Sequence, residues 1–132
     1  LCESKIKKAR KNFNRKNLKF INGNIVSIDL RKEFKTLILS NILEHIEFRI
    51  KFLENLLKNY KPEILLIRVP LYERDWRVPL KKELGIEWRL DKTHFIEYRV
   101  SELFEELNSV GIKIKSHKIC WGEIWLTAGI IK

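Results

Sequence analysis

Four polar residues gather where a buried strand gives way to a helical segment. In the stretch LSNILEHI, residues 39–46, apolar side chains recur at spacings of three and four, which places them on one face of a helix start. Ser40, Asn41, Glu44 and His45 lie between those apolar positions. Hydroxyl, amide, carboxylate and imidazole groups at such a place can bind a ligand or accept a proton. The alternative is that His45 only occupies the solvated first turn of a helix.

Two further histidines extend the set of groups that could do chemistry. His94, in DKTHF, is a candidate general base or substrate contact, and the alternative is a hydrogen-bonded histidine that stabilises a loop. His117 falls in the middle of an expected strand, which indicates a structural role. Because the three histidines are dispersed and Cys2 and Cys120 are far apart, the sequence predicts no metal site.

The elements that must position these residues alternate between helices and strands. We read them from apolar periodicity and from the turn residues at their ends. The expected elements are a helix over 3–14, a strand over 18–21 closed by NGN at 22–24, a strand over 34–39, a helix capped by Asn41 and Glu44 that stops before Pro62, a strand over 63–69, a helix between Ser101 and Gly111, and two antiparallel strands within 112–131.

This order predicts the α/β fold class, with a Rossmann-like, mostly parallel open sheet and an antiparallel C-terminal hairpin. In such sheets, ligands bind beyond the carboxyl ends of the strands. Both NGN and SNILEH fall at that edge. The polar residues of the opening stretch are therefore expected to border a ligand crevice.

Residues 70–98 interrupt the pattern and are expected to form a lid-like insertion. The aromatic side chains of this segment can line a substrate pocket, or they can form the small core that a long excursion needs. Its arginines can bind a phosphate or carboxylate, or they can lie on the surface. The aromatic residues are Tyr72, Trp76, Trp88, Phe95 and Tyr98, and the arginines are Arg74, Arg77 and Arg89.

Composition limits the possible partners. The 132-residue chain carries a net charge of +10, which is compatible with a polyanionic partner such as nucleic acid, although a solvated basic surface is the preferred explanation. The chain contains no Gln or Met and is rich in Lys, Glu and Ile, a usage typical of thermophiles. No apolar run is long enough to cross a bilayer, and we expect a cytoplasmic protein.

Five stretches occur in an order and at spacings that match one known family. They are KIKKARKN, LKFINGNI, FKTLILSNILEHI, YKPEILLIRVP and THFIEYRVSELFEELNSVGIKI. Together they resemble the C-terminal two-thirds of a class I S-adenosylmethionine-dependent methyltransferase. The resemblance implies a partial methyltransferase domain over residues 1–132, with S-adenosylmethionine as its cofactor.

The resemblance also implies roles for single residues. Leu1 would pack on the adenine, Asn24 would accept a hydrogen bond from the adenine amino group, and Ile25 follows it. Ser40 and Asn41 would border the methionine part of the cofactor. His45 and His94 would be the catalytic bases if the acceptor must lose a proton. Apart from the resemblance, the dense polar and aromatic residues of the lid-like insertion make Tyr72, Arg77 and His94 the expected substrate contacts.

The sequence departs from the family at its N-terminal side. It contains no Gly-x-Gly stretch, and the acidic residue that binds the ribose would fall just before Leu1. We therefore expect that the N-terminal part of the sheet is missing and that the chain alone is inactive.

The expected activity in a complete domain is methyl transfer to a small-molecule, sugar or lipid acceptor. The alternative is a non-catalytic fragment or a basic module that binds nucleic acid or phosphates. Exposed strand edges could also lead to self-association.

Overall fold

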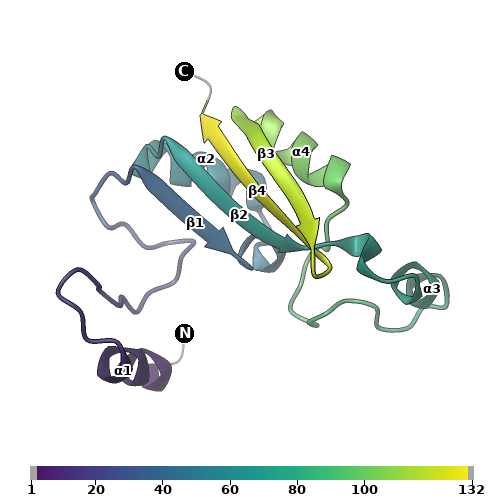
Figure 1. Ribbon diagram of the computed structural model, residues 1–132, viewed down its shortest axis with the longest axis horizontal. Coiled ribbons are helices and arrows are strands. Elements are labelled where there is room, and N and C mark those ends of the chain that lie inside the picture. The colour runs from purple at the N-terminus through teal and green to yellow at the C-terminus, as the bar shows by residue number, and fades with distance from the viewer. Residues whose placement is uncertain (1–2, 131–132) are drawn as a thin grey trace. The chain divides into compact units, whose positions relative to one another are not determined.

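The computed structural model describes residues 3–130 and divides the chain into two compact units, residues 1–30 and 31–132. In the first unit, the helix α1 spans Glu3–Asn12, which confirms the expected N-terminal helix (Figure 1). An ion pair between Lys7 and Glu3, with nitrogen and oxygen 3.3 Å apart, joins successive turns of α1.

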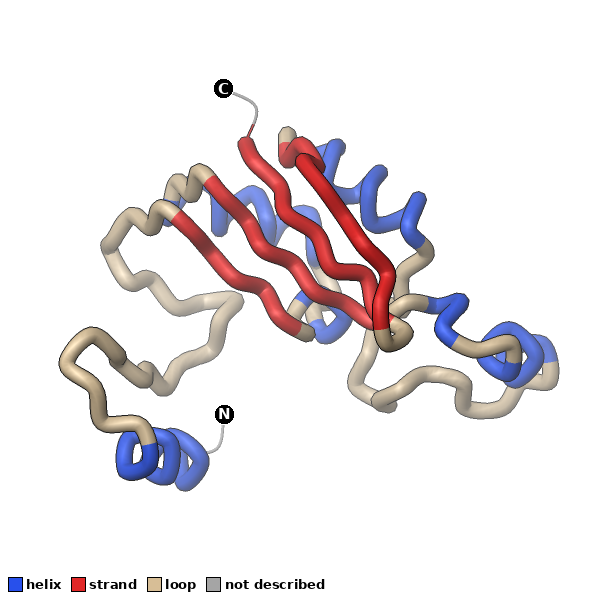
Figure 2. Tube along the Cα trace, viewed as in Figure 1, coloured by secondary structure: helices blue, strands red, loops and turns tan. Residues whose placement is uncertain are grey.

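The prediction of a strand over residues 18–21 is wrong. Among the described residues of the first unit, 3–30, no strand forms (Figure 2). A strand needs a partner for its backbone groups, and this unit contains only a helix and turns. Asn24 begins one of these turns, because its backbone carbonyl accepts hydrogen bonds from the amides of Ser27 and Ile28 at 3.1 and 2.8 Å.

The second unit is built on a four-stranded mixed sheet with the order β1-β2-β4-β3. β1 (Thr36–Ser40) and β2 (Ile64–Pro70) are parallel, whereas β4 (Glu123–Ile130) is antiparallel to both β2 and β3 (Ile112–Cys120). Figure 1 shows the four strands side by side. The α/β class, the Rossmann-like sheet and the C-terminal hairpin are confirmed.

Two helices, α2 (Arg49–Tyr60) and α4 (Val100–Ser109), pack against one face of this sheet and lie behind it in Figure 1. Alternate residues of each strand point toward them, as the period of two requires. Burial of this apolar layer is the main stabilising term of the unit. Its strand and helix residues include Leu39, Leu53, Leu56, Leu65, Ile67, Val69, Leu103, Leu107, Ile112, Ile124, Leu126 and Ala128.

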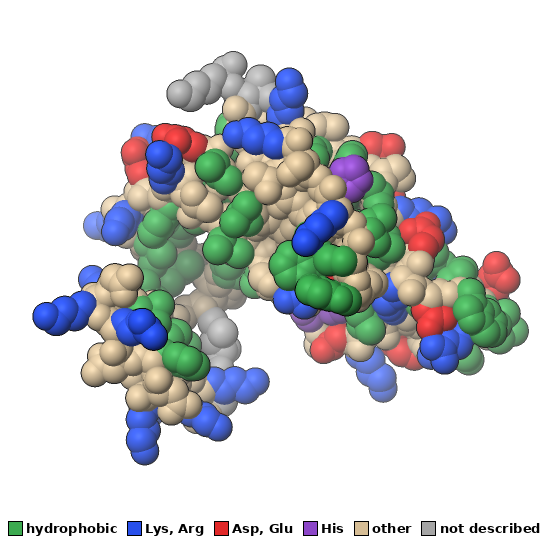
Figure 3. Space-filling view, in the orientation of Figure 1, with side chains coloured by type: hydrophobic (Ala, Val, Ile, Leu, Met, Phe, Trp, Pro, Cys, Tyr) green, Lys and Arg blue, Asp and Glu red, His purple; other side chains and the backbone are tan. Residues whose placement is uncertain are grey.

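The opposite face of the sheet exposes apolar side chains. Ile38 is 67% exposed, and it lines a shallow groove of about 470 Å³ with Leu66 and Trp125. Figure 3, which views this face, shows hydrophobic side chains over the sheet. An accessible apolar surface of this kind favours association with other protein surfaces.

The connection after β1 differs from the expected helix. Asn41 has a φ of 51°, in the left-handed region, and its amide donates to the carbonyl of Arg68 at 2.9 Å. The residue therefore continues the pairing with β2 and cannot cap a helix. A single 3₁₀ turn, η1 (Leu43–His45), follows, and α2 starts only at Arg49.

The segment between β2 and α4 contains the 3₁₀ turn η2 (Tyr72–Arg74) and the helix α3 (Arg77–Glu83). Sequence periodicity did not predict α3, because only one of its residues, Val78, is buried. The ring of Tyr72 packs edge-on against Trp88, with centroids 5.4 Å apart. Part of the aromatic set therefore forms a small core, as one of the two alternatives predicts.

The segment returns to the sheet just before α4. Leu71 forms an isolated parallel bridge with Tyr98, and the amide of Tyr72 donates to the carbonyl of Tyr98 at 2.8 Å. At the far end of α4, Gly111 has a φ of 78° and ends the helix as expected. No helix among residues 3–130 is long and apolar enough to cross a membrane.

Candidate functional site

The turn η1 and the loop before Tyr98 meet at one end of the sheet. The amide of Phe95 donates to the carbonyl of Glu44 at 2.8 Å. The hydroxyl of Thr93 lies 2.9 Å from Nδ1 of His45 and donates to the carboxylate of Asp91 at 2.8 Å. These contacts join two segments that are almost fifty residues apart, and they bring two of the three histidines together.

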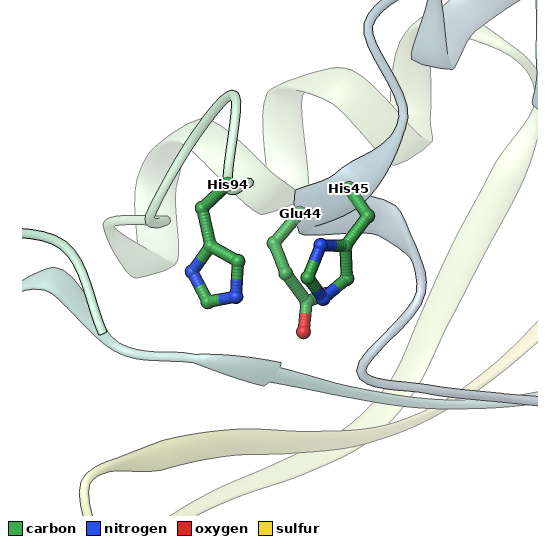
Figure 4. A group of neighbouring side chains, drawn as sticks. All are labelled: Glu44, His45 and His94. Carbon is green, nitrogen blue, oxygen red and sulfur yellow. The ribbon is translucent and has the colours of Figure 1, made fainter. Parts of the chain in front are cut away.

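Glu44, His45 and His94 form a compact cluster (Figure 4). One carboxylate oxygen and one nitrogen from each imidazole all lie within 4.8 Å of one another. The two imidazole rings are edge-on, with centroids 4.5 Å apart. Three ligand atoms at this spacing match the donor set that a metal site with open coordination positions requires.

The carboxylate of Glu44 is unusual, since it is buried and both of its oxygens lack a hydrogen-bond partner among residues 3–130. Burial raises the pKa of Glu44 above its ordinary value of 4.5, although its own backbone amide and then the nearby histidines oppose this shift. Buried polar groups are normally hydrogen-bonded, because an unpaired one costs about 1–3 kcal/mol. A bound cation would supply the missing partner.

Hydrogen bonds orient both imidazole rings toward the cluster. Because the Thr93 hydroxyl gives its hydrogen to Asp91, it accepts one from Nδ1–H of His45. Nδ1 of His94 lies 3.2 Å from the buried carboxylate of Glu97, which can only accept when ionised. In both rings the proton is therefore on Nδ1, and Nε2 keeps the lone pair that a metal ion needs.

The residues expected at the end of β1 have separate surroundings. Ser40 is exposed and lines the same groove of the open sheet face as Ile38. Asn41, also exposed, forms the bend between β1 and η1. Both stand at the carboxyl end of a parallel strand, where ligands of open α/β sheets bind. Their roles toward a cofactor stay predictions.

The other expected residues have partners of their own. Tyr72 is only 6% exposed, and the guanidinium carbon of Arg99 lies 4.5 Å from the centroid of the Tyr72 ring. Arg77 is paired with Asp75 at the start of α3. In the first unit, the side-chain oxygen of Asn24 accepts from the amide of Val26 at 3.0 Å.

Ile25, also in the first unit, is 41% exposed, whereas Leu1 lies outside the described residues. The cofactor and substrate roles expected for these residues also stay predictions.

Sequence reasoning placed Glu44 only generally among the polar residues at the crevice, and it overlooked Glu97. The expected capping box gives the Glu44 carboxylate a different role, in which it accepts a hydrogen bond from a backbone amide at the helix start. The signal that could have revealed it is the Glu–His pair directly after a strand, combined with His94 in a second polar loop. Glu97 follows His94 by three residues, the spacing at which side chains meet in a single turn.

Comparisons with known proteins concern the fold. No family model and no curated protein matches the sequence. Several solved structures do match. The small RNA methyltransferase HEN1 has a TM-score of 0.66 and 14% identity over 82% of this chain. The chain has the class I methyltransferase fold.

Two other solved structures are similar to the chain. The magnesium protoporphyrin IX methyltransferase ChlM of Synechocystis, with SAH bound, has a TM-score of 0.63 and 15% identity over 95% of this chain. DhpI, in a complex with SAM and HEP, has a TM-score of 0.65 and 16% identity over 96%. The chain spans 15% of the HEN1 structure, 57% of ChlM and 63% of DhpI.

Proposed function

We propose that the protein takes part in S-adenosylmethionine-dependent methyl transfer, with a divalent cation held by Glu44, His45 and His94. The fold supports the first half of this proposal, since DhpI is described as a complex with SAM and ChlM as bound to SAH. The observation that carries the second half is the buried, unpartnered carboxylate of Glu44 between two imidazoles oriented by hydrogen bonds.

The residues of this chain fit one part of the cofactor. Ser40 and Asn41 offer an exposed hydroxyl and amide at the carboxyl end of β1, which suits the amino and carboxylate groups of a methionine moiety. The 132-residue sequence contains no glycine-rich loop of the kind that would hold the rest of the cofactor. When bound, S-adenosylmethionine supplies an activated methyl group on a sulfonium.

The cluster suits a first-row divalent cation such as Mn²⁺, because two imidazoles and one carboxylate leave coordination positions open. A bound divalent ion lowers the pKa of a hydroxyl that reaches it. Within this arrangement His45 and His94 act as ligands and not as general bases, so their sequence-based roles are revised in the proposal. Glu44 balances part of the added positive charge.

We further propose that the acceptor is a ribose hydroxyl of RNA. Neutral hydroxyl groups are weak nucleophiles and gain most from a cation, and the 2′-hydroxyl is the group that distinguishes RNA from DNA. The net charge of +10 suits a polyanion, and HEN1 is described as a small RNA methyltransferase. Other sugars, small molecules and lipids, which the sequence also suggests, are the competing acceptors.

In this proposal residues 70–98 act as a lid over the acceptor. His94 reaches the cluster from the C-terminal end of this segment, and Phe95 beside it is 58% exposed. An exposed aromatic ring next to the cation offers a stacking surface for a base. Cytoplasmic residence and self-association through the edge strands β1 and β3 belong to the same proposal.

The test has two arms on the 132-residue chain. Calorimetric titration with Mn²⁺ measures cation binding, and fluorescence anisotropy in the presence of Mn²⁺ measures binding of a labelled synthetic RNA, with 2′-deoxy oligonucleotides, free sugars and lipid vesicles as competitors. We expect His94→Ala to abolish cation binding. The matched variant is His117→Ala, since His117 is exposed on β3 and packs on Phe104.

Cation binding that survives His94→Ala would contradict the proposed metal site. 2′-Deoxy oligonucleotides that bind as tightly as RNA would contradict the proposed acceptor.

A further inference from the structure

Glu97 is a second buried carboxylate beside the cluster, and it differs from Glu44 in having several partners. The residue is 3% exposed, and one of its oxygens lies 3.2 Å from Nδ1 of His94. It also accepts hydrogen bonds from the backbone amide of Leu90 and from the guanidinium of Arg74. Glu97 therefore holds together three separate parts of the 70–98 segment, around Arg74, Leu90 and His94.

Arg74 is fixed in turn by the hairpin between β3 and β4. Its guanidinium donates to the carbonyls of Leu71 and Trp88 at 3.1 and 3.0 Å, in addition to Glu97. Gly122, in the hairpin turn, approaches so closely that a β-carbon there would lie 2.9 Å from the β-carbon of Arg74. The position of the carboxylate is therefore set by the sheet through Arg74.

We propose that Glu97 is a positioning residue, which holds His94 as the Nδ1–H tautomer with Nε2 directed at the proposed cation. The proposal rests on the metal site of the proposed function and adds a residue that does not touch the ion. The geometry is that of a carboxylate–histidine–metal triad, in which the outer carboxylate orients the ring and strengthens the nitrogen as a ligand. Arg74 pairs with Glu97 and supplies the opposite charge that a buried carboxylate needs.

The contrast between Glu44 and Glu97 supports the assignment of different roles. Every contact of Glu97 is to a protein donor, so the structure already satisfies it. Glu44 has no donor among residues 3–130 and lies beside both His45 and His94. One carboxylate is thus suited to bind an ion directly, whereas the other orients a ligand of that ion.

The experiment compares Glu97→Gln with Glu73→Gln in the full 132-residue chain. Glu73 makes the matched control, because it also pairs with an arginine, Arg99, but lies exposed and away from the histidines. Mn²⁺ affinity is measured by calorimetry, and the visible absorption of bound Co²⁺ reports the ligand geometry. We expect Glu97→Gln to weaken Mn²⁺ binding by about 10–100-fold and to change the Co²⁺ spectrum, with neither effect in Glu73→Gln.

Glu97→Gln leaves Arg74 without its partner and can prevent folding, so a double variant is included. Arg74→Leu combined with Glu97→Gln removes both charges, and cooperative thermal unfolding verifies that it folds. The same loss of affinity in this variant supports the proposal.

Wild-type affinity and an unchanged Co²⁺ spectrum in the folded double variant would overturn the proposal, even if Mn²⁺ binds. Absence of Mn²⁺ binding to the wild-type chain would instead overturn the proposed function on which it rests.

Discussion

Replacing Glu44 by Leu should stabilise the metal-free chain. The carboxylate is fully buried and has no hydrogen-bond partner among residues 3–130. An apolar side chain of similar size removes that unsatisfied group, which is worth about 1–3 kcal/mol. For a chain of 132 residues, each kcal/mol raises the melting temperature by about 4 °C, so we expect a gain of about 4–12 °C.

Mn²⁺ should make the wild-type chain more stable than Glu44→Leu. At a concentration of a thousand times the dissociation constant, a cation that binds only the folded state adds about 4.1 kcal/mol, or about 16 °C, which exceeds the gain expected for Glu44→Leu. Wild type should gain that increment in scanning calorimetry, and Glu44→Leu should gain nothing. The control is Glu54→Leu, an exposed substitution on α2 that should change stability by less than about 0.5 kcal/mol and keep the response to Mn²⁺.

The advantage of Glu44→Leu should also depend on pH. Burial raises the pKa of Glu44 in the folded state, so the folded chain keeps a proton that the unfolded chain releases above pH 4.5. Wild type should therefore lose stability relative to the variant as the pH rises above 4.5 toward neutrality. A metal-free variant that melts below wild type at neutral pH, or that responds to Mn²⁺ as wild type does, would refute the reasoning.

Three further predictions concern the framework around the site. Tyr98→Phe removes a buried hydroxyl that donates to Glu106 and should cost about 1.5–3 kcal/mol in urea unfolding; no loss would show that this bond contributes nothing. Gly122→Ala should destabilise more than Gly85→Ala, because both glycines have positive φ but only Gly122 contacts Arg74; equal losses would contradict that contact. Ile38→Lys should reduce self-association in sedimentation without changing the unfolding midpoint, and an unchanged mass distribution would exclude this face as an interface.

The sheet could be predicted from the sequence because its strands carry strong local signals. The apolar run 63–69 matches strand β2 within one residue. The two strands expected within 112–131 match the hairpin of β3 and β4 equally closely. The strand over 18–21 failed for a physical reason, since a short apolar run becomes a strand only where a neighbour supplies hydrogen bonds. Helix α3 was missed because almost all of its side chains are exposed and leave no periodic pattern.

The site was only partly predictable. The sequence indicated His45 and His94 separately, but not that the turns around Thr93 and Phe95 bring them together through single hydrogen bonds. The left-handed backbone of Asn41 also escaped prediction. It replaces the expected helix start with a 3₁₀ turn, and this change buries Glu44 beside the histidines. Contacts between distant loops depend on the whole fold, which local patterns do not encode.

The most direct measurement of the central claim is anomalous diffraction from crystals of the chain grown with Mn²⁺. The account predicts one anomalous peak at coordination distance from a carboxylate oxygen of Glu44 and from Nε2 of both His45 and His94. A map with no peak at this cluster, or with the ion bound only by other residues, would contradict it.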